Sequence, residues 1–504
     1  MTEKKPDSLL PKDWRGRMNV SSVPTGQNTR HGTSDTTPAT QMQTTQSGKP
    51  SRLVSLDAYR GFIMTMLAAN GFGILAFSRI DASSPVWQHH DYDWWQRLAE
   101  NFEHPLWVSL KGSYGVAFWD LIQPAFMFMV GVSMPFSYGR RSMMGQSDSS
   151  RMLHAILRSV VLILMGVFLN SIRDERTDWA FPNVLCQIGL GYFFAWLLLN
   201  RSYSVQVISL LMILGVNWLM FYVNTPPKDF DYSAVEAHEE DGEVFTDRFA
   251  QWSKNSNTAY QFDAWLLPKL RSADSDAETS NATDDSAAAS TADKDGSEKL
   301  AQDSNPKKPA LLRRLLFSNP EPYRPNRGGY TTLNFVPSIG TTLIGIMCGQ
   351  LLLSGAVPPW RKLWMLVGAA ALCYGVGLLM HHTMCPIVKR IWTPSWVFFS
   401  GGFIIGMLAL FYLAFDLLPF RRIAFPLVVV GMNSILIYMM GQLIRGWTAS
   451  QILRVHFTGL IEAIFGSTAL DPEWYAPIVE STGVFLLFWL FLFWLYRQRI
   501  FLRI

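Results

Sequence analysis

The clearest shortage in this chain of 504 residues is charge. Only 16% of its residues are Asp, Glu, Lys or Arg, against about 25% in a typical soluble protein. Hydrophobic residues make up 49%, and the sequence contains 19 Trp and 33 Phe. This balance excludes an ordinary soluble domain and predicts an integral membrane protein surrounded by lipid. The net charge of +4 is too weak to predict a nucleic-acid partner.

Cysteine, internal repeats and an N-terminal apolar core are scarce or missing as well. The four cysteines, Cys186, Cys348, Cys373 and Cys385, lie in or beside apolar runs without metal-ligand spacing. We therefore expect buried thiols and no metal. Residues 1–50 lack an apolar core, so we expect no cleavable signal peptide. Their richness in Thr, Ser, Gln and Pro predicts a disordered cytoplasmic tail.

The chain does contain a series of apolar runs from residue 51 onward. A span needs roughly 20 apolar residues, and about ten runs approach that length. The predicted fold class is an all-α polytopic membrane bundle of about ten transmembrane helices in one domain, 51–504. The predicted spans are Leu53–Phe77, Val116–Tyr138, Leu153–Ile172, Val184–Leu199, Val205–Val223, Leu333–Leu353, Leu363–Met380, Trp396–Leu418, Ile423–Leu443 and Val479–Tyr496.

The Lys and Arg residues of the short loops predict the orientation of the bundle. Cytoplasmic loops are enriched in these residues, and an N-in, C-in arrangement places the richest loops inside. Segment 224–332 then becomes an extracytoplasmic insertion. Its Ser, Asp, Ala and Thr tract, at about 273–305, is predicted to be disordered. Lys389 and Arg390 fall on the outer side, against the general trend.

His104 is the strongest candidate for chemistry, because it precedes an apolar run that carries Asp120 at its entrance. A histidine titrates near neutral pH, and a nearby carboxylate can orient it. The alternative is an interfacial histidine that anchors a loop. His89 and His90 are local competitors in a more acidic stretch, and we rank them lower.

Two polar positions lie within the first predicted span. Asn70 falls near its outer end, where an amide donor could stabilise an oxyanion, although a lone Asn is often interhelical glue. Asp57 and Arg60 lie at the inner end with i, i+3 spacing, as a boundary ion pair or as an anion site. We predict that Asn70, His104 and Asp120 form an active site at the outer membrane face.

Several motifs resemble those of the heparan-α-glucosaminide N-acetyltransferase family of transmembrane acyltransferases. They are RLVSLDAYRGFIMTMLAANGFG (52–73), H-x-x-W (104–107), FWDLIQPAFMFMVGVSMPFS (118–137), PNVLCQIGLGYFF (182–194), CPIVKRIWTPSWVFFSGG (385–402) and GMNSILIYMMGQ (431–442). The chain looks like a bacterial-type member without the luminal domain. The family's histidine, asparagine and aspartate fall on His104, Asn70 and Asp120.

This resemblance implies acetyl transfer from cytoplasmic acetyl-CoA to an amino sugar or related glycan acceptor on the outer side. It implies a location in a bacterial inner membrane and is compatible with assembly as a homodimer. His104 would act as base or as acetyl relay. The expected donor-binding residues are Arg60, Arg140, Arg141, Arg158, Asn433 and Ser434, in a cleft open to both sides.

Two rival functions remain. A sugar or amino-sugar transporter would also have about ten spans with polar residues at mid-membrane. We weigh against it the lack of a recognisable pair of broken helices in the sequence. A non-catalytic membrane scaffold is the second rival, and it leaves Asn70, His104 and Asp120 unexplained.

Overall fold

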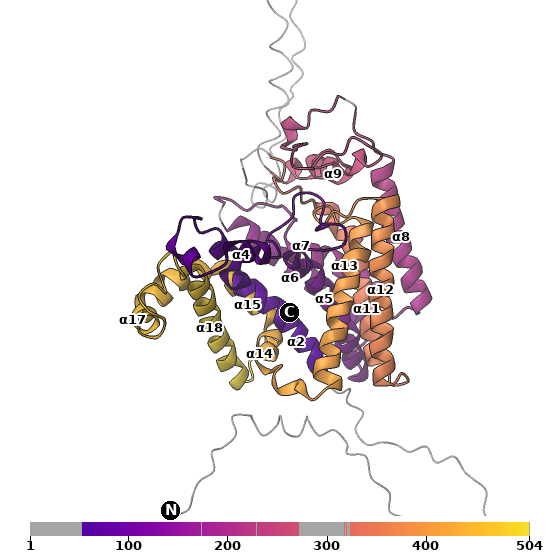
Figure 1. Cartoon of the computed structure of the whole chain (residues 1–504). Coiled ribbons are helices and arrows are strands. Elements are labelled where there is room, and N and C mark those ends of the chain that lie inside the picture. The colour runs from indigo at the N-terminus through magenta and orange to yellow at the C-terminus, as the bar shows by residue number, and fades with distance from the viewer. Residues whose placement is uncertain are drawn as a thin grey trace, which may run out of the picture. The chain divides into compact units, whose positions relative to one another are not determined.

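The computed structural model describes residues 53–172, 174–227, 229–271, 317, 319 and 323–502. These residues are mostly helical and include no β-strand (Figure 1). The predicted tail, 1–50, and the predicted disordered tract, 273–305, lie outside the described residues and stay predictions. The main helices are α2 (Val54–Ala68), α3 (Ile74–Ser78), α4 (Tyr92–Ala99), α5 (Phe118–Met143), α6 (Asp148–Ser171), α7 (Val184–Leu198), α8 (Tyr203–Tyr222), α9 (Thr258–Leu266), α11 (Phe335–Leu353), α12 (Pro359–Thr383), α13 (Pro394–Tyr412), α14 (Phe425–Met432), α15 (Ser434–Leu443), α16 (Arg445–Trp447), α17 (Arg454–Phe465) and α18 (Ala476–Arg497).

Each predicted apolar run coincides with a helix or with two helices separated by a break. Within the described residues, seven helices are long and apolar enough to cross a membrane, or nine if each of two bent pairs forms one span. Helix α7 has 15 residues, short of the roughly 20 that a span needs. The predicted count of about ten spans is therefore not confirmed. The long apolar helices nevertheless suggest an integral membrane protein.

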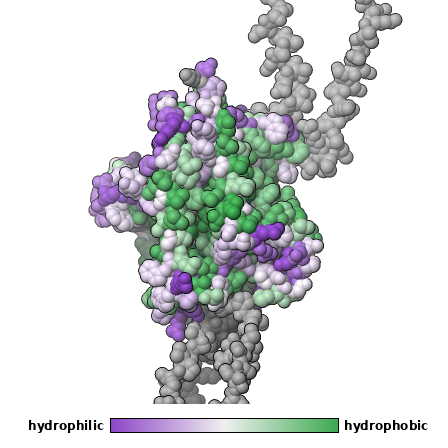
Figure 2. Space-filling model, turned by 90° about the vertical axis from the view of Figure 1, so that its right-hand side faces the viewer, coloured by the Kyte–Doolittle hydropathy of each residue, from purple (hydrophilic) through white to green (hydrophobic). Residues whose placement is uncertain are grey.

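Helices α5 and α11 pack against each other at the centre of the bundle, with 78% and 72% of their spans buried. Helices α6, α8 and α12 are peripheral, and α12 is only 17% buried. The outward side chains of α8 and α12 are apolar, among them Ile208, Met212, Trp364 and Leu372. Figure 2 shows this apolar surface in green. Water hydrates such a surface poorly, whereas lipid chains match it.

The two bent helix pairs, α2–α3 and α14–α15, cross at glycines, where their backbones are in direct contact. A Cβ atom on Gly61 of α2 would lie 1.8 Å from the carbonyl oxygen of Leu427 in α14. A Cβ atom on Gly431 would lie 1.9 Å from the carbonyl oxygen of Asp57. Only glycine permits this approach from both sides. Helices α2 and α3 are bent by 47° at their break, and α14 and α15 by 78° at theirs. The crossing places Gly431, two residues before Asn433 at the second break, beside Asp57 and Gly61, whereas the first break begins further along at Asn70.

Three connecting segments meet at one end of the bundle: 79–117, the described residues of 223–334, and 384–393. Figure 1 shows α9, from the second segment, at the top of the bundle and α4, from the first, lower and to the left. The indole Nε1 of Trp107 donates a hydrogen bond to the carbonyl of Trp252 at 2.9 Å, which joins the first two segments. The candidate site lies where these segments meet the helix ends.

Candidate active site

Three ionisable side chains meet where α5 begins. Nδ1 of His104 lies 2.7 Å from Oδ1 of Asp120, and Nζ of Lys389 donates to the same oxygen at 3.1 Å. Nζ of Lys389 also lies 3.4 Å from Nδ1 of His104. The side chains of Asp120 and Lys389 are only 2% and 4% exposed, whereas that of His104 is 41% exposed. A buried ion pair thus holds one nitrogen of a solvent-accessible imidazole.

Local structure explains how each charged partner reaches this point. Asp120 lies in the first turn of α5, where free backbone N–H groups favour a carboxylate. Lys389 lies in a turn between α12 and α13 that ends at Trp392, whose φ is +50°. The backbone N–H of Lys389 donates to Oγ of Ser109 at 3.0 Å, and Ser109 donates its own N–H to the carbonyl of Ile387 at 2.8 Å. The lysine turn is therefore tied to the loop that carries His104.

Trp107 anchors that loop three residues after His104. Its ring is 1% exposed and its Nε1 is bonded to the carbonyl of Trp252. On the other side of the loop, Nη2 of Arg390 donates to the carbonyl of Pro105 at 3.1 Å. These two contacts fix the loop directly after His104, so the position of the imidazole depends on segments far along the chain.

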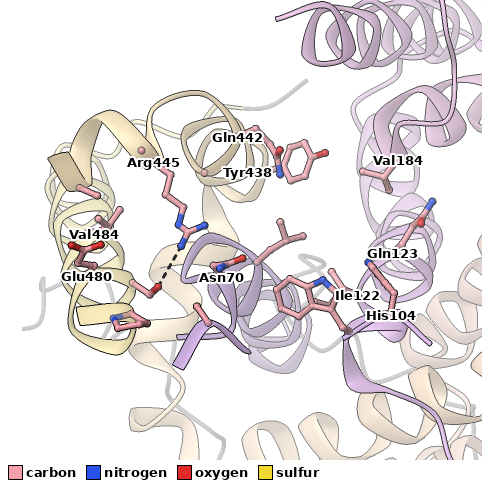
Figure 3. Close-up of a pocket in the computed structure, with 18 of the residues that line it drawn as sticks. Asn70, His104, Ile122, Gln123, Val184, Tyr438, Gln442, Arg445, Glu480 and Val484 are labelled. Atoms are coloured by element: carbon pink, nitrogen blue, oxygen red, sulfur yellow. Dashed lines mark hydrogen bonds between the residues drawn. The ribbon is translucent and has the colours of Figure 1, made fainter. Parts of the chain in front are cut away.

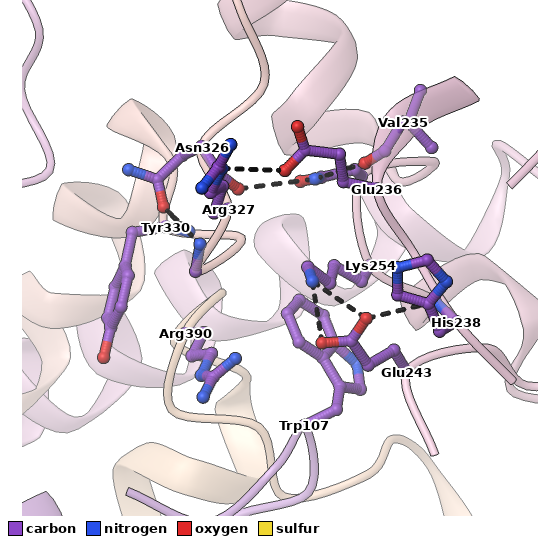
Figure 4. Close-up of polar contacts among 12 residues, drawn as sticks. Trp107, Val235, Glu236, His238, Glu243, Lys254, Asn326, Arg327, Tyr330 and Arg390 are labelled. Atoms are coloured by element: carbon purple, nitrogen blue, oxygen red, sulfur yellow. Dashed lines mark hydrogen bonds and ion pairs between the residues drawn. The ribbon is translucent and has the colours of Figure 1, made fainter. Parts of the chain in front are cut away.

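A buried ion pair in the insertion supports Trp107. Figure 4 shows Lys254 and Glu243 beside the indole, with Nζ 2.7 and 2.8 Å from the two carboxylate oxygens. Both side chains are less than 10% exposed. The chain passes close over the same ring at Gly329, where a Cβ atom would lie 2.5 Å from the indole. The described part of the insertion therefore packs onto the loop that carries His104.

A cavity of about 910 Å³ lies beside His104 (Figure 3). Its polar lining comes from several separate elements and includes Asn70, His104, Gln123, Lys389, Tyr438, Gln442, Arg445, Glu480 and Ser481. Figure 3 shows His104 and Arg445 reaching the cavity from different sides, with Asn70 between them. The volume is ample for a monosaccharide or a comparable polar ligand.

Asn70 stands at the break between α2 and α3. It and the next three residues all have positive φ, namely +49° at Asn70, +60° at Gly71, +56° at Phe72 and +73° at Gly73. Glycine and asparagine adopt this conformation readily, whereas at Phe72 it costs of order 1–3 kcal/mol. The Asn70 amide makes no side-chain hydrogen bond among the described residues and lines the cavity. The turn thus places an amide at the cavity, where it could bond a ligand.

This arrangement has the parts of a general base. A carboxylate only accepts hydrogen bonds, so the contact to Asp120 assigns the Nδ1 proton to His104. Nε2 then carries a lone pair that can take a proton or attack an acyl carbon. Lys389 balances the charge of Asp120, so the cluster is neutral overall while the imidazole is neutral.

The competing histidines lie elsewhere. Nε2 of His90 lies 3.0 Å from the hydroxyl of Tyr475, among the rings of Phe77 and Trp95. His89 packs against the ring of Trp474. Neither lines the cavity described above. The structure brings His104 to Asp120 and Asn70 to the same cavity, while the identity of the base stays a prediction.

The residues predicted to bind the donor do not line this cavity. They are Arg60, Arg140, Arg141, Arg158, Asn433 and Ser434. Two of them, Arg141 and Arg158, act electrostatically on His154 near the far end of α5, and the guanidinium of Arg158 lies 4.8 Å from the centre of the Tyr192 ring. The cavity described here therefore gives no support to the predicted cleft open to both sides.

Asn433 has a structural role. It is fully buried at the break between α14 and α15. Its Nδ2 donates to the carbonyl of Ile500 at 3.2 Å, and its Oδ1 accepts from the N–H of Leu502 at 2.9 Å. Both ends of the amide hold the segment after α18, so none is directed at a ligand. Ser434 is the first residue of α15.

Three cations of the cavity lining, Lys389, Arg445 and Arg454, are not among the predicted site residues. Lys389 carried a signal, because it is a positive charge in a loop that the orientation places outside. Arg445 carried one as well, because it directly follows an apolar run.

No protein-family model and no curated protein sequence matches the chain. Its function is therefore argued from the geometry of the cavity.

Proposed function

We propose that the chain is a membrane acyltransferase that moves an acetyl group from acetyl-CoA to an amino sugar or related glycan acceptor. The observation that carries the proposal is the 2.7 Å contact between His104 Nδ1 and Asp120 at the edge of a cavity that Asn70 also lines. A base, its orienting carboxylate and an amide donor are the groups that acyl transfer to an amine requires.

In the proposed reaction, the acceptor nitrogen attacks the thioester carbonyl while Nε2 of His104 takes its proton. The Asn70 amide donates a hydrogen bond to the oxyanion that forms. Collapse of this intermediate completes the amide bond and breaks the C–S bond, and His104 returns the proton to the departing thiolate. In a relay, His104 would first take the acetyl group itself and then pass it to the amine.

The proposed topology is N-in and C-in, with the His104 cluster outside. The loops at the other end carry Arg140, Arg141, Arg151, Arg201, Arg361, Lys362, Arg421 and Arg422. The excess of positive charge at that end supports a cytoplasmic location. Acetyl-CoA would approach from there, with Arg141 and Arg158 near its phosphates, in a bacterial inner membrane.

A transporter for a polar solute is the second candidate, and one observation favours it. The expectation that the chain has no pair of broken helices is wrong, because α2–α3 and α14–α15 are both bent at a break. The two pairs contact each other, and both contribute lining residues, Asn70 from one and Tyr438 and Gln442 from the other. Discontinuous helices of this kind hold substrates in many transporters.

One experiment separates the two functions. Protein in liposomes is given acetyl-CoA and glucosamine, and both N-acetylglucosamine and free CoA are measured, alongside glucosamine uptake without acetyl-CoA. His104→Ala should lower acetyl transfer by roughly 10²–10⁴-fold, whereas His90→Ala should keep nearly the full rate. Unchanged transfer in His104→Ala would refute the proposal. Uptake that needs no acetyl-CoA would support the transporter instead.

A further inference from the structure

The cavity carries an excess of positive charge at the side away from His104. Its lining contains three permanent cations, Lys389, Arg445 and Arg454, and one carboxylate, Glu480. Lys389 is paired with Asp120 behind the wall. Arg454 forms an ion pair with Glu480. After these pairs are taken together, Arg445 is the cation of the described lining that lacks a carboxylate of its own.

Arg445 is held where an incoming anion could meet it. It follows the broken pair α14–α15, and Figure 3 shows its guanidinium directed toward α18. Its one side-chain hydrogen bond among the described residues is from Nη2 to the neutral hydroxyl of Ser481, at 3.3 Å. Glu480 attracts it electrostatically but is engaged by Arg454. Most donors of the guanidinium fork are therefore available.

A half-buried guanidinium without a counter-ion is costly, because burial removes water without replacing it by an anion. Ligands that bring the anion remove this cost. The planar fork of arginine fits phosphate, sulfate and carboxylate groups through two parallel hydrogen bonds. An amine or hydroxyl of an uncharged sugar cannot satisfy it in the same way.

We propose that Arg445, steadied by Ser481, forms an oxyanion subsite of this cavity. It binds a phosphate, sulfate or carboxylate of a ligand whose other end reaches His104. The reaction at the other end of the ligand rests on the proposed acyl transfer, whereas the binding of the anion by Arg445 does not. The group comes either from an acidic substituent on the acceptor or from the phosphates of the acyl donor, and in the second case the donor's phosphates bind at this end of the bundle rather than near Arg141 and Arg158.

The test is binding of four probes to purified full-length protein by isothermal titration calorimetry. The probes are CoA, inorganic phosphate, glucosamine and glucosamine 6-phosphate. Arg445→Gln should weaken a phosphate-bearing probe by roughly tenfold or more, which corresponds to about 1.4 kcal/mol, and leave glucosamine unchanged. Glu480→Gln should tighten the same probe, because it removes the competing carboxylate. Arg327→Gln, at an 87% exposed side chain outside the cavity, is the matched control.

The results also identify the source of the anion. Weaker CoA binding in Arg445→Gln assigns the subsite to the donor, and weaker glucosamine 6-phosphate binding assigns it to the acceptor. If neither probe responds to Arg445→Gln or to Glu480→Gln, the subsite is refuted even where acetyl transfer occurs. If the probes respond but no transfer occurs, the subsite holds and the acyltransferase proposal fails. Should Arg445→Gln not fold, Arg445→Lys and Glu480→Gln decide.

Discussion

Replacing Lys389 by methionine tests the ion pair at the base of the site. The change keeps a long unbranched side chain and removes the ammonium group that lies 3.1 Å from Asp120. Asp120 is 2% exposed, so its carboxylate would keep His104 as its remaining ionisable neighbour. Removing one partner of a buried ion pair typically costs about 3–5 kcal/mol of unfolding free energy. We expect a loss of that size for Lys389→Met, less whatever His104 recovers.

The double variant Asp120→Asn with Lys389→Met removes both charges and supplies the second arm of a cycle. It should be more stable than Lys389→Met alone, because no uncompensated charge is left in the wall. Unfolding midpoints in detergent, followed by tryptophan fluorescence, measure stability for the wild type, the two single variants and the double variant.

Activity gives an independent readout of the same variants. In Lys389→Met the unbalanced carboxylate favours a protonated imidazole, so acetyl transfer should fall at neutral pH and recover as the pH is raised. Additive stability effects and a pH–rate profile identical to the wild type would show that the Lys389–Asp120 contact contributes nothing.

Three further predictions follow from particular residues. Asn70→Gly suits the positive φ at that position, so it should keep the fold while raising the activation barrier of acetyl transfer by about 2.7–4 kcal/mol. Full turnover in this variant would rule out an oxyanion contact. Burial raises the pKa of the Asp263 carboxyl from 3.8 to about 6. The folded state therefore holds this proton more tightly than the unfolded state, and stability falls as the pH rises from about 4 to 6. Asp263→Asn should raise the unfolding midpoint at pH 7.5 and have little effect below pH 4, and an equal effect at both would contradict this. In a background without native cysteines, Leu106→Cys should react with an impermeant thiol reagent from outside and Trp360→Cys only after the membrane is opened; the reverse would invert the topology.

The helices were predictable from the sequence because their signal is local. Apolar runs between polar segments can satisfy their backbone only as helices in a lipid environment. The breaks were not predicted, although both fall at isolated asparagines, Asn70 and Asn433. The sequence predicts a ligand contact within a continuous helix at each position, with interhelical glue as the alternative at Asn70. The structure shows that each ends one helix and precedes the next.

The site was partly predictable. His104 and Asp120 are 16 residues apart, and a carboxylate at a helix entrance near a histidine is visible in the sequence. Lys389 is 269 residues from Asp120, and the contact depends on how the connecting segments at that end of the bundle fold together. A single sequence gives no direct signal for a contact between residues so far apart. The indirect sign of this contact in the sequence is a positive charge on the predicted outer side, where such charges are less common.

The same separation has a consequence for how the protein is made. Synthesis runs from the N-terminus, so α5 and Asp120 enter the membrane long before Lys389 is translated. During that interval the carboxylate has at most His104 beside it, and Trp107 still lacks Trp252, which lies 145 residues later. A nascent chain released before residue 389 would contain His104 and Asp120 yet lack Lys389. The last partner to be translated, rather than the first helix to insert, therefore sets the moment at which the site can be complete.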